Sequence, residues 1–314
     1  MTTVTEPAKT AMTTVQCPVC GGDADYASDV PGWGDWRRCR TCTLEFANPL
    51  RLGFDPTELF NDAYQGKVQK SAMTDFHERV DQRRVIIEDL DEPSLWFWTP
   101  AFDEVLSWLR QRLAPGSTVL ELGCGLGFFL HALRKEGFRA VGLDVAKTVV
   151  DLNRKDGFEV WHGPIASMPK EWVRPDAVVS FFMLHHLDDP IGFLRAIRER
   201  APDAPLAIAV YGPTNIGTAA SLPPRTLIRW NGQALAAALG RVGYKVQVHE
   251  IQSTGAERRF LQPLRKAMAR TMRMPVIYRF GKQIESRLLP RLPGQVRRES
   301  YVVLALAEPV APQP

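Results

Sequence analysis

Four of the five cysteines lie close together near the N-terminus, in two pairs of identical spacing. Cys17 and Cys20 form one Cys-x2-Cys pair, Cys39 and Cys42 form the second, and eighteen residues separate the pairs. This pattern is typical of a tetrahedral zinc site, because each tight turn presents two thiolates to one ion. Four protein ligands leave no position for water, so we expect the Zn²⁺ to be structural. A redox or disulfide pair and an iron–sulfur site are the alternatives.

A glycine-rich segment offers a second kind of chemistry. Gly123, Gly125 and Gly127 follow a predicted strand, and glycines at such a turn let a ligand approach the main chain. A dinucleotide fingerprint would need a further glycine where Phe128 stands, so a dinucleotide is disfavoured. Asp144 ends the next predicted strand, where a carboxylate can accept hydrogen bonds from both ribose hydroxyls. The two strand ends together predict a site for an adenosine-containing ligand.

The acid-x-Gly-x-Gly-x-Gly spacing that begins at Glu121 resembles motif I of the class I S-adenosylmethionine (SAM)-dependent methyltransferases. Residues 181–190 (FFMLHHLDDP) and 210–215 (VYGPTN) are similar to the segments that follow the fourth and fifth strands of that family. The resemblance covers about residues 95–250 and the last strand. It implies SAM as the cofactor, with Glu121 near its methionine end. The cofactor-binding residues that it implies are Glu121, Gly123, Cys124, Gly125, Gly127, Asp144, Val145 and Phe181.

The cysteine module, followed by LEFANPL (44–50), is similar to a zinc-binding module that precedes many bacterial methyltransferase domains acting on sugars and secondary metabolites. This resemblance implies a small-molecule acceptor. Related deoxysugar C-methyltransferases usually carry a further C-terminal domain, whereas this chain ends just after its last predicted strand, so we expect O-methylation. The alternatives are an RNA or protein methyltransferase and a non-catalytic SAM-binding protein.

Three side chains are candidates for the catalytic step. His185 and His186 follow the predicted fourth strand, at the rim where an acceptor would lie, and either could act as a base near neutral pH. Tyr211 ends the predicted fifth strand and is a candidate contact to the acceptor. The alternative is that these rings only pack, or form hydrogen bonds within the turn.

Residues 258–298 carry twelve Lys or Arg residues against one acid, Glu285. Apolar residues at helical spacing predict two helices here, within an insertion at 255–298. The segment has three interpretations: a solvated helical hairpin, a cap that recognises an anionic or carrier-linked acceptor, and peripheral contact with an anionic membrane surface. We expect no nucleic-acid partner, because the residues between the cysteine pairs include two arginines against four aspartates.

Strand and helix patterns alternate from residue 118 onward, which predicts an α/β fold. We expect a Rossmann-like, doubly wound, seven-stranded and mostly parallel sheet, preceded by a small zinc ribbon-like module and with the basic helical insertion before its last strand. The predicted strands are 118–122, 139–144, 158–161, 176–182, 206–211, 244–250 and 300–307. The predicted helices in this part are 127–136, 147–155, 191–200 and 232–241, and two more lie at 74–90 and 101–113.

The expected organisation is a flexible N-terminus at 1–15, the zinc module at 16–48, a helical connector or cap at 49–115, the SAM-binding domain at 116–308 and a flexible tail at 309–314. With 45% apolar and 24% charged residues, the composition is that of an ordinary globular protein. The first fifteen residues lack the apolar core of a signal peptide, and the longest apolar stretch is too short to span a bilayer. We therefore expect a cytoplasmic protein.

Overall fold

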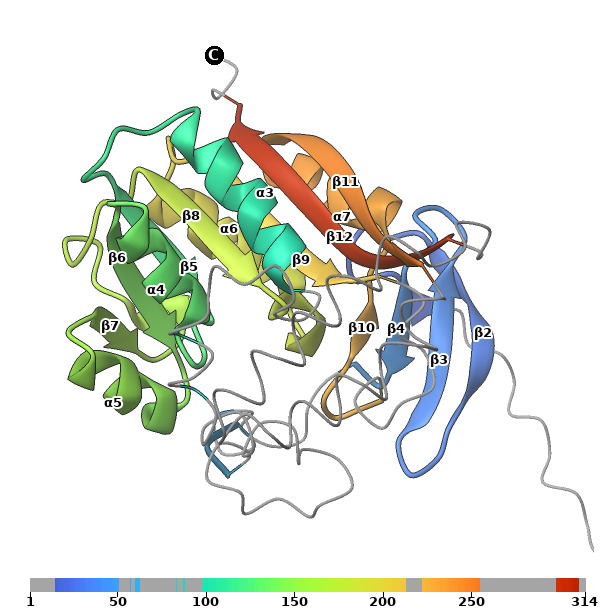
Figure 1. The fold of residues 1–314 in the computed structure, drawn as a ribbon. Coiled ribbons are helices and arrows are strands. Elements are labelled where there is room, and N and C mark those ends of the chain that lie inside the picture. Colours follow the sequence, from blue (N-terminus) through green and yellow to red (C-terminus); the bar gives the residue numbers. More distant parts are fainter. Residues whose placement is uncertain are drawn as a thin grey trace, which may run out of the picture.

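The computed structural model describes residues 15–50, 57, 60–62, 83, 87, 98–212, 222–254 and 298–310. In this part of the chain, a large sheet with helices on both faces lies beside a smaller sheet (Figure 1). None of the described helices is long and apolar enough to cross a membrane.

The large sheet has seven strands in the order β11-β12-β9-β8-β5-β6-β7. Strands β9, β8, β5, β6 and β7 run parallel to one another, while β12 runs antiparallel to both β9 and β11. This arrangement confirms the predicted doubly wound, mostly parallel sheet. The strands are β5 (Thr118–Leu122), β6 (Arg139–Asp144), β7 (Glu159–His162), β8 (Ala177–Phe181), β9 (Leu206–Tyr211), β11 (Tyr244–Thr254) and β12 (Arg298–Pro309).

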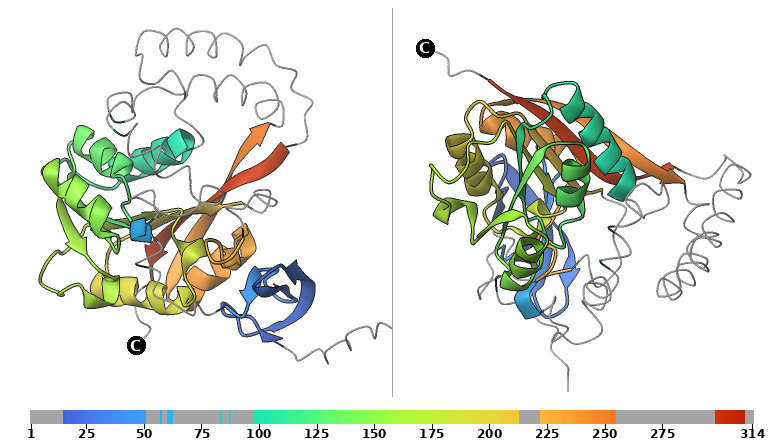
Figure 2. Two further views of the ribbon diagram at one scale, coloured as in Figure 1. Left: turned by 90° about the horizontal axis from the view of Figure 1, so that it is seen from below. Right: turned by 60° about the vertical axis from the view of Figure 1, so that its left-hand side comes forward.

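Helices cover both faces of this sheet, which is why its central strands are apolar on every side chain but a few (Figure 2). Residues such as Val119 and Val179 pack on the face of α3 and α4, whereas Leu120 and Val178 pack on the face of α6 and α7. The first face holds α3 (Trp98–Arg110), α4 (Phe128–Lys135) and α5 (Lys147–Lys155), and the second holds α6 (Pro190–Arg200) and α7 (Gly232–Arg241).

The start of α7 is fixed by its N-cap. The side-chain oxygen of Asn231 accepts a hydrogen bond from the backbone N–H of Ala234 at 2.8 Å, which satisfies one of the free donors of the first turn. Leu235 and Leu239, one turn apart, are then buried against the sheet. Residues 225–231, which lead into this cap, are joined to the turn after β8 by a hydrogen bond from the N–H of Leu227 to the carbonyl of His185.

The smaller sheet is antiparallel, in the order β1-β2-β3-β4-β10. Although residues 16–48 show little periodicity, they form β1 (Val15–Gln16), β2 (Asp23–Val30), β3 (Gly34–Cys39) and β4 (Glu45–Asn48). The fifth strand, β10 (Ile228–Arg229), comes from the loop before α7. The cysteine module and the large domain thus share one sheet, and they also share one buried apolar cluster.

Several predicted segments lie largely or wholly outside the described residues. These are the N-terminus at 1–15, the part of the 49–115 connector before residue 98 with its helix at 74–90, the basic insertion at 255–298 and the tail at 309–314. Of the insertion, the structure describes Arg298, the first residue of β12. The predicted domain boundaries stay predictions.

Candidate functional site

The carboxyl ends of β5, β6, β8 and β9 meet at one edge of the large sheet, and most of the predicted site residues lie there. Strand order reverses between β5 and β8, which is where a doubly wound sheet binds its ligand. Glu121 lies in β5, and Asp144, Phe181 and Tyr211 end the other three strands.

Glu121 is a buried carboxyl group, 3% exposed, and its Oε2 atom has no hydrogen-bond partner among the described residues. Burial raises its pKa well above the usual value, and the charge of Asp144 raises it further. A buried polar atom without a partner costs about 1–3 kcal/mol. A ligand with a positive charge or a hydrogen-bond donor at this position would remove that cost, so Glu121 fits a cationic cofactor.

Asp144 is also buried, but its carboxylate is held by the backbone. Its Oδ2 accepts from the N–H of Gly125 at 2.8 Å, and its Oδ1 accepts from the N–H of Ala146 at 2.8 Å. Burial raises its pKa, against the effect of these two bonds. Each oxygen keeps a second lone pair, which leaves room for a ribose hydroxyl at both. Val145, the next residue, uses its carbonyl to accept a hydrogen bond from Nε2 of His162 at 3.1 Å.

The glycine-rich turn after β5 is held from behind by two side chains that the sequence analysis did not identify. Asn153 of α5 donates to the carbonyl of Gly125 at 2.8 Å. The buried Arg83 donates to the carbonyl of Leu126 at 2.7 Å and to the side-chain oxygen of Asn153 at 3.0 Å. Arg83 is itself paired with Asp156 at 2.6 Å.

The space next to two of the glycines is filled by the protein itself. A Cβ atom on Gly127 would lie 1.9 Å from Oδ1 of Asn153, and one on Gly123 would lie 2.8 Å from Sδ of Met183. Cys124 is buried between them, with Asn153 close to its sulfur. Glycine at 123 and 127 therefore allows close packing around the turn, while Gly125 supplies the N–H that binds Asp144.

The two phenylalanines after β8 have different surroundings. The ring of Phe181 packs between Phe102 and Phe129, at centroid distances of 4.9 and 4.5 Å, so its side chain belongs to the apolar core. Phe182 has a φ of 55°, a left-handed conformation that is strained for a bulky residue. Its ring stacks on Tyr211 at 4.6 Å. Strain of this kind often marks a functional site, and a sequence gives no signal for it.

His185 and His186 form a tilted ring pair with centroids 3.9 Å apart, and Tyr211 lies 4.9 Å from His185. The structure therefore brings together the three predicted catalytic side chains. Nδ1 of His186 donates a hydrogen bond to the carbonyl of Arg225. Since a carbonyl can only accept, the neutral ring must carry its proton on Nδ1, and Nε2 is then the unprotonated nitrogen.

Both histidines are neutral at pH 7. Burial lowers the pKa of His186 to about 4, with a further lowering by the Arg225 charge against the effect of the backbone hydrogen bond. Burial also lowers the pKa of His185 well below its usual value, and its Nδ1 has no partner among the described residues. The pair thus offers unprotonated ring nitrogen next to a stacked aromatic wall.

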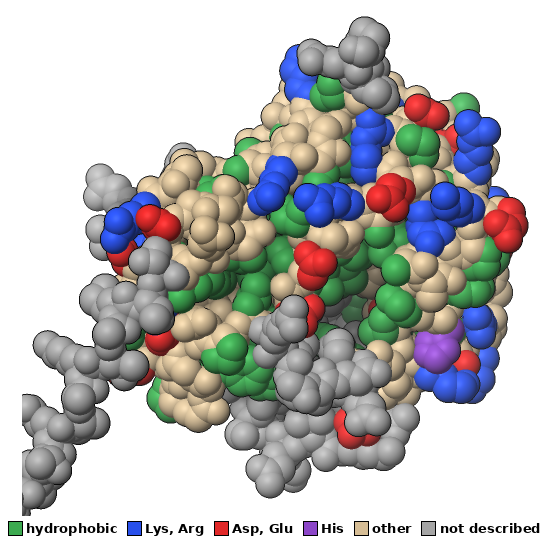
Figure 3. Space-filling model, turned by 180° about the vertical axis from the view of Figure 1, so that it is seen from behind, with side chains coloured by type: hydrophobic (Ala, Val, Ile, Leu, Met, Phe, Trp, Pro, Cys, Tyr) green, Lys and Arg blue, Asp and Glu red, His purple; other side chains and the backbone are tan. Residues whose placement is uncertain are grey.

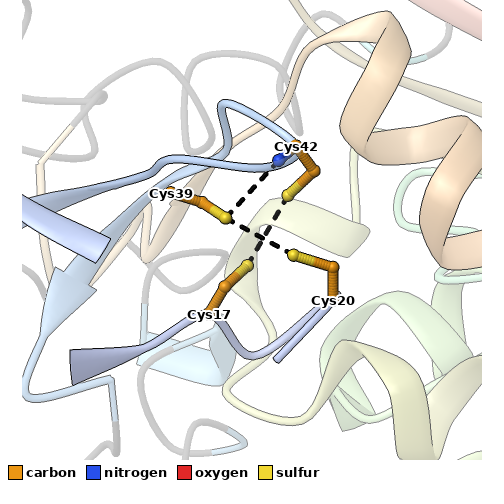
Figure 4. A group of neighbouring side chains, drawn as sticks. All are labelled: Cys17, Cys20, Cys39 and Cys42. Carbon is orange, nitrogen blue, oxygen red and sulfur yellow. Dashed lines mark hydrogen bonds between the residues drawn. The ribbon is translucent and has the colours of Figure 1, made fainter. Parts of the chain in front are cut away.

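The four N-terminal cysteines converge on one point (Figure 4). Their sulfurs all lie within 4.8 Å of one another, with Cys17 and Cys42 at 3.6 Å and Cys20 and Cys39 at 3.4 Å. Tetrahedral zinc with Zn–S bonds of about 2.3 Å needs sulfurs about 3.8 Å apart, so the donor set fits this ion. The backbone N–H groups of Thr41 and Cys42 donate to Sγ of Cys39, as expected around a thiolate.

On the side of the molecule opposite to that in Figure 1, hydrophobic side chains gather in a hollow in the middle, and basic and acidic side chains are interspersed around it (Figure 3). Among the described residues drawn in this view, basic and acidic side chains alternate and no surface of a single charge sign is seen.

Comparison with known proteins identifies the domain. Residues 97–248 match the family model of a methyltransferase domain. This match covers 152 of the 314 residues, and that part of the chain is similar to a methyltransferase domain. The prediction of a SAM-dependent methyltransferase is therefore confirmed at the level of this domain. Which of the residues described above bind the cofactor or act in catalysis stays a prediction.

The curated relatives match part of the chain. A ribosomal protein L11 methyltransferase of Cupriavidus taiwanensis is 37% identical over 83 residues, which are 25% of this chain and 27% of the relative. A "Probable S-adenosylmethionine-dependent methyltransferase" of Mycolicibacterium smegmatis is 33% identical over 110 residues, which are 34% of this chain and 42% of the relative. The match thus covers less than half the length of either relative.

Among solved structures, the phosphoethanolamine N-methyltransferase 2 of Haemonchus contortus, in complex with S-adenosyl-L-methionine, superposes with a TM-score of 0.50 at 14% identity. The superposition covers 84% of this chain and 62% of that one. At this identity the likeness shows a shared fold.

Proposed function

We propose that the protein transfers a methyl group from SAM to a hydroxyl group of a small molecule, a sugar or a natural product. The observation that carries the proposal is the pair of buried carboxyl groups at the carboxyl edge of the sheet, with Oε2 of Glu121 unpaired among the described residues. A cationic nucleoside satisfies both groups, because Glu121 would meet the positively charged methionine end and Asp144 the ribose hydroxyls.

The residues that would hold SAM are those around the glycine-rich turn. Asp144 is already oriented by two backbone N–H groups, so little is lost when it binds the ribose. Asn153 and Arg83 fix the carbonyls of the turn from the other side, which leaves the ligand-facing edge free of their side chains. Bound SAM supplies an activated methyl group, and the chain supplies alignment of the acceptor with it.

His186 is our candidate for the base. In the proposed transfer, the acceptor oxygen would take the methyl group that bound SAM supplies, which leaves S-adenosylhomocysteine, and Nε2 of His186, the unprotonated nitrogen of the ring, would accept the hydroxyl proton. The burial that keeps His186 neutral also makes it a weak base. We therefore assign most of the rate to alignment of the acceptor, with Tyr211 and His185 as the walls of its pocket, and the remainder to the proton transfer.

The four cysteines would hold a structural Zn²⁺ as thiolates. With four protein ligands the ion has no open position, so it supplies folding energy and no reaction step. The acceptor would be anionic or linked to a carrier, which is what the twelve basic residues of 258–298 support. The rival use of that segment is contact with an anionic membrane surface.

A macromolecular acceptor is the rival class, since the Cupriavidus relative is named for ribosomal protein L11. That match covers 83 residues and 27% of the relative, so we do not transfer the acceptor of that protein to this chain.

The test is transfer of labelled methyl from SAM by the full chain, with separate panels of nucleotide-linked sugars, free glycosides and phenolic natural products, and with total RNA and ribosomal protein as the rival panel. Label in a small-molecule hydroxyl supports the proposal. Label confined to RNA or protein would replace the acceptor class, and tight SAM binding without transfer to any panel would favour a non-catalytic role.

A further inference from the structure

The cysteine module is attached to the histidine pair through one short segment of the chain. Residues 225–231, here called the strap, run from the carboxyl edge of the large sheet into the N-cap of α7. Within the strap, Leu227, Ile228 and Trp230 are completely buried. The strap therefore has no freedom to move unless the surfaces around it separate.

On one side the strap holds the histidines. The N–H of Leu227 donates to the carbonyl of His185 at 2.9 Å, and the carbonyl of Arg225 accepts from Nδ1 of His186. The first bond fixes the backbone of the histidine turn. The second decides which ring nitrogen of His186 carries the proton.

On the other side the strap is part of the cysteine module. The carbonyl of Leu227 accepts from the N–H of Ala47 at 2.8 Å. Leu227 therefore joins β4 to His185 through its own backbone carbonyl and N–H. Ile228 and Arg229 pair with Phe46 and Glu45 as strand β10. The guanidinium of Arg229 lies 3.8 Å from the centroid of the Trp36 ring and 3.3 Å from Glu45, a cation–π contact and an ion pair with the module.

Both metal-binding turns are anchored to the helix that the strap begins. Asn231 donates to the carbonyl of Thr43 at 3.1 Å, and Gln233 donates to the carbonyl of Thr41 at 3.1 Å, on either side of Cys42. Arg241 donates to the carbonyl of Val19, next to Cys20, at 2.6 Å. These carbonyls keep their positions only while the two turns keep theirs.

We infer that the four-cysteine module is a positioning element for the acceptor site: with its metal bound, it holds the strap, and the strap fixes the turn and the tautomer of His186. The two Cys-x2-Cys turns carry the carbonyls that the strap and α7 bind, and one ion bound by all four sulfurs would fix both turns, so the metal would be needed for this role. The bonds described above join the strap to His185 and His186, so we expect the role to concern the acceptor and to leave cofactor binding unchanged. The inference rests on the proposed function only where it calls this site the acceptor site.

The test follows the His186 ring by nitrogen NMR in full-length protein labelled at its histidines, with the signal assigned from the spectrum of His186→Gln. With zinc bound, we expect one tautomer, protonated at Nδ1. After chelation of zinc, we expect both tautomers and a His186 pKa that moves from about 4 toward its ordinary value of 6.5, because water reaches the ring. A folded, metal-free protein with an unchanged His186 signal would overturn the inference.

Because metal removal could unfold the chain, two variants of the strap test the link with the metal in place. Arg229→Met keeps the length of the side chain but loses the contacts with Trp36 and Glu45, and we expect it to mix the tautomers. Arg229→Lys keeps the charge facing Glu45 and should restore most of the Nδ1-protonated form. The matched control is Arg139→Met, which removes an exposed ion pair with Glu159 near the other edge of the large sheet. The inference is wrong if Arg229→Met and Arg139→Met give the same His186 signal.

Calorimetric titration with S-adenosylhomocysteine separates this inference from the proposed function. We expect the Arg229 variants to bind it within twofold of the unmodified chain. If even the unmodified chain gives no binding, the proposed function fails while the tautomer result still decides the role of the strap. A tenfold loss of S-adenosylhomocysteine binding in Arg229→Met, but not in Arg139→Met, would show that the strap also affects the cofactor site. That result would contradict the inference.

Discussion

Substitution of Gly127 by alanine tests how the cofactor turn is built. Gly127 has a φ of +78°, and a Cβ there would lie 1.9 Å from Oδ1 of Asn153. Gly157 is the matched control, because its φ is +81° and a Cβ there would meet nothing within 4 Å. The left-handed backbone alone lowers the free energy of unfolding by about 1–2 kcal/mol when alanine replaces glycine, and this loss is common to both variants.

Only Gly127→Ala must also displace Asn153. That side chain donates to the carbonyl of Gly125 and accepts from the guanidinium of Arg83. Loss of a neutral hydrogen bond costs about 1 kcal/mol, and loss of one to a charged group about 1.5–3 kcal/mol. We therefore expect Gly157→Ala to lower the free energy of unfolding by about 1–2 kcal/mol and Gly127→Ala by about 4 kcal/mol.

Urea unfolding at equilibrium measures both values, provided that the slope with urea stays the same. We also expect S-adenosylhomocysteine to bind more weakly to Gly127→Ala, because the Gly125 N–H that orients Asp144 moves with the turn. The reasoning is refuted if the two variants lose the same free energy of unfolding, since Asn153 would then not be fixed against the turn.

Two further predictions concern ionisable groups. Because burial and Asp144 raise the pKa of Glu121, the folded protein binds a proton there that the unfolded chain releases above about pH 4.5, so this group destabilises the free protein as pH rises through the raised pKa. Glu121→Gln should therefore raise the melting temperature of the free protein at pH 7. The variant should also lack the gain in SAM affinity that we expect the unmodified protein to show with rising pH. A lowered melting temperature would contradict this account. His186→Gln should slow methyl transfer to a hydroxyl acceptor by about 100-fold, measured by steady-state kinetics, and leave the calorimetric affinity for S-adenosylhomocysteine unchanged. An unchanged rate with a weakened affinity would contradict this prediction.

The large domain was predictable because its signals are local. The apolar runs at 118–122 and 206–211 became β5 and β9 with the same bounds, and Asp144 stands at the end of β6 as its pattern indicated. The cysteine spacing likewise brought four sulfurs together, because each pair is set by a single turn.

What could not be predicted depends on contacts between distant residues. Strand β10 has two residues, which are too few to show the alternation of apolar and polar residues that predicts a strand. It forms because its backbone pairs with β4. Arg83 reaches the carbonyl of Leu126, 43 positions away, and nothing in its neighbourhood marks it as buried. The tautomer of His186 likewise depends on the carbonyl of Arg225, which only the folded strap brings to the ring.

The central claim is that the ends of β5 and β6 bind SAM, and calorimetric titration of the full chain with SAM and S-adenosylhomocysteine tests it most directly. The account predicts binding of both, and a loss of about 10–100-fold in Asp144→Asn, whose amide cannot accept from the N–H groups and the ribose together. Absence of heat with both nucleosides, or equal affinity of the unmodified chain and Asp144→Asn, would contradict it.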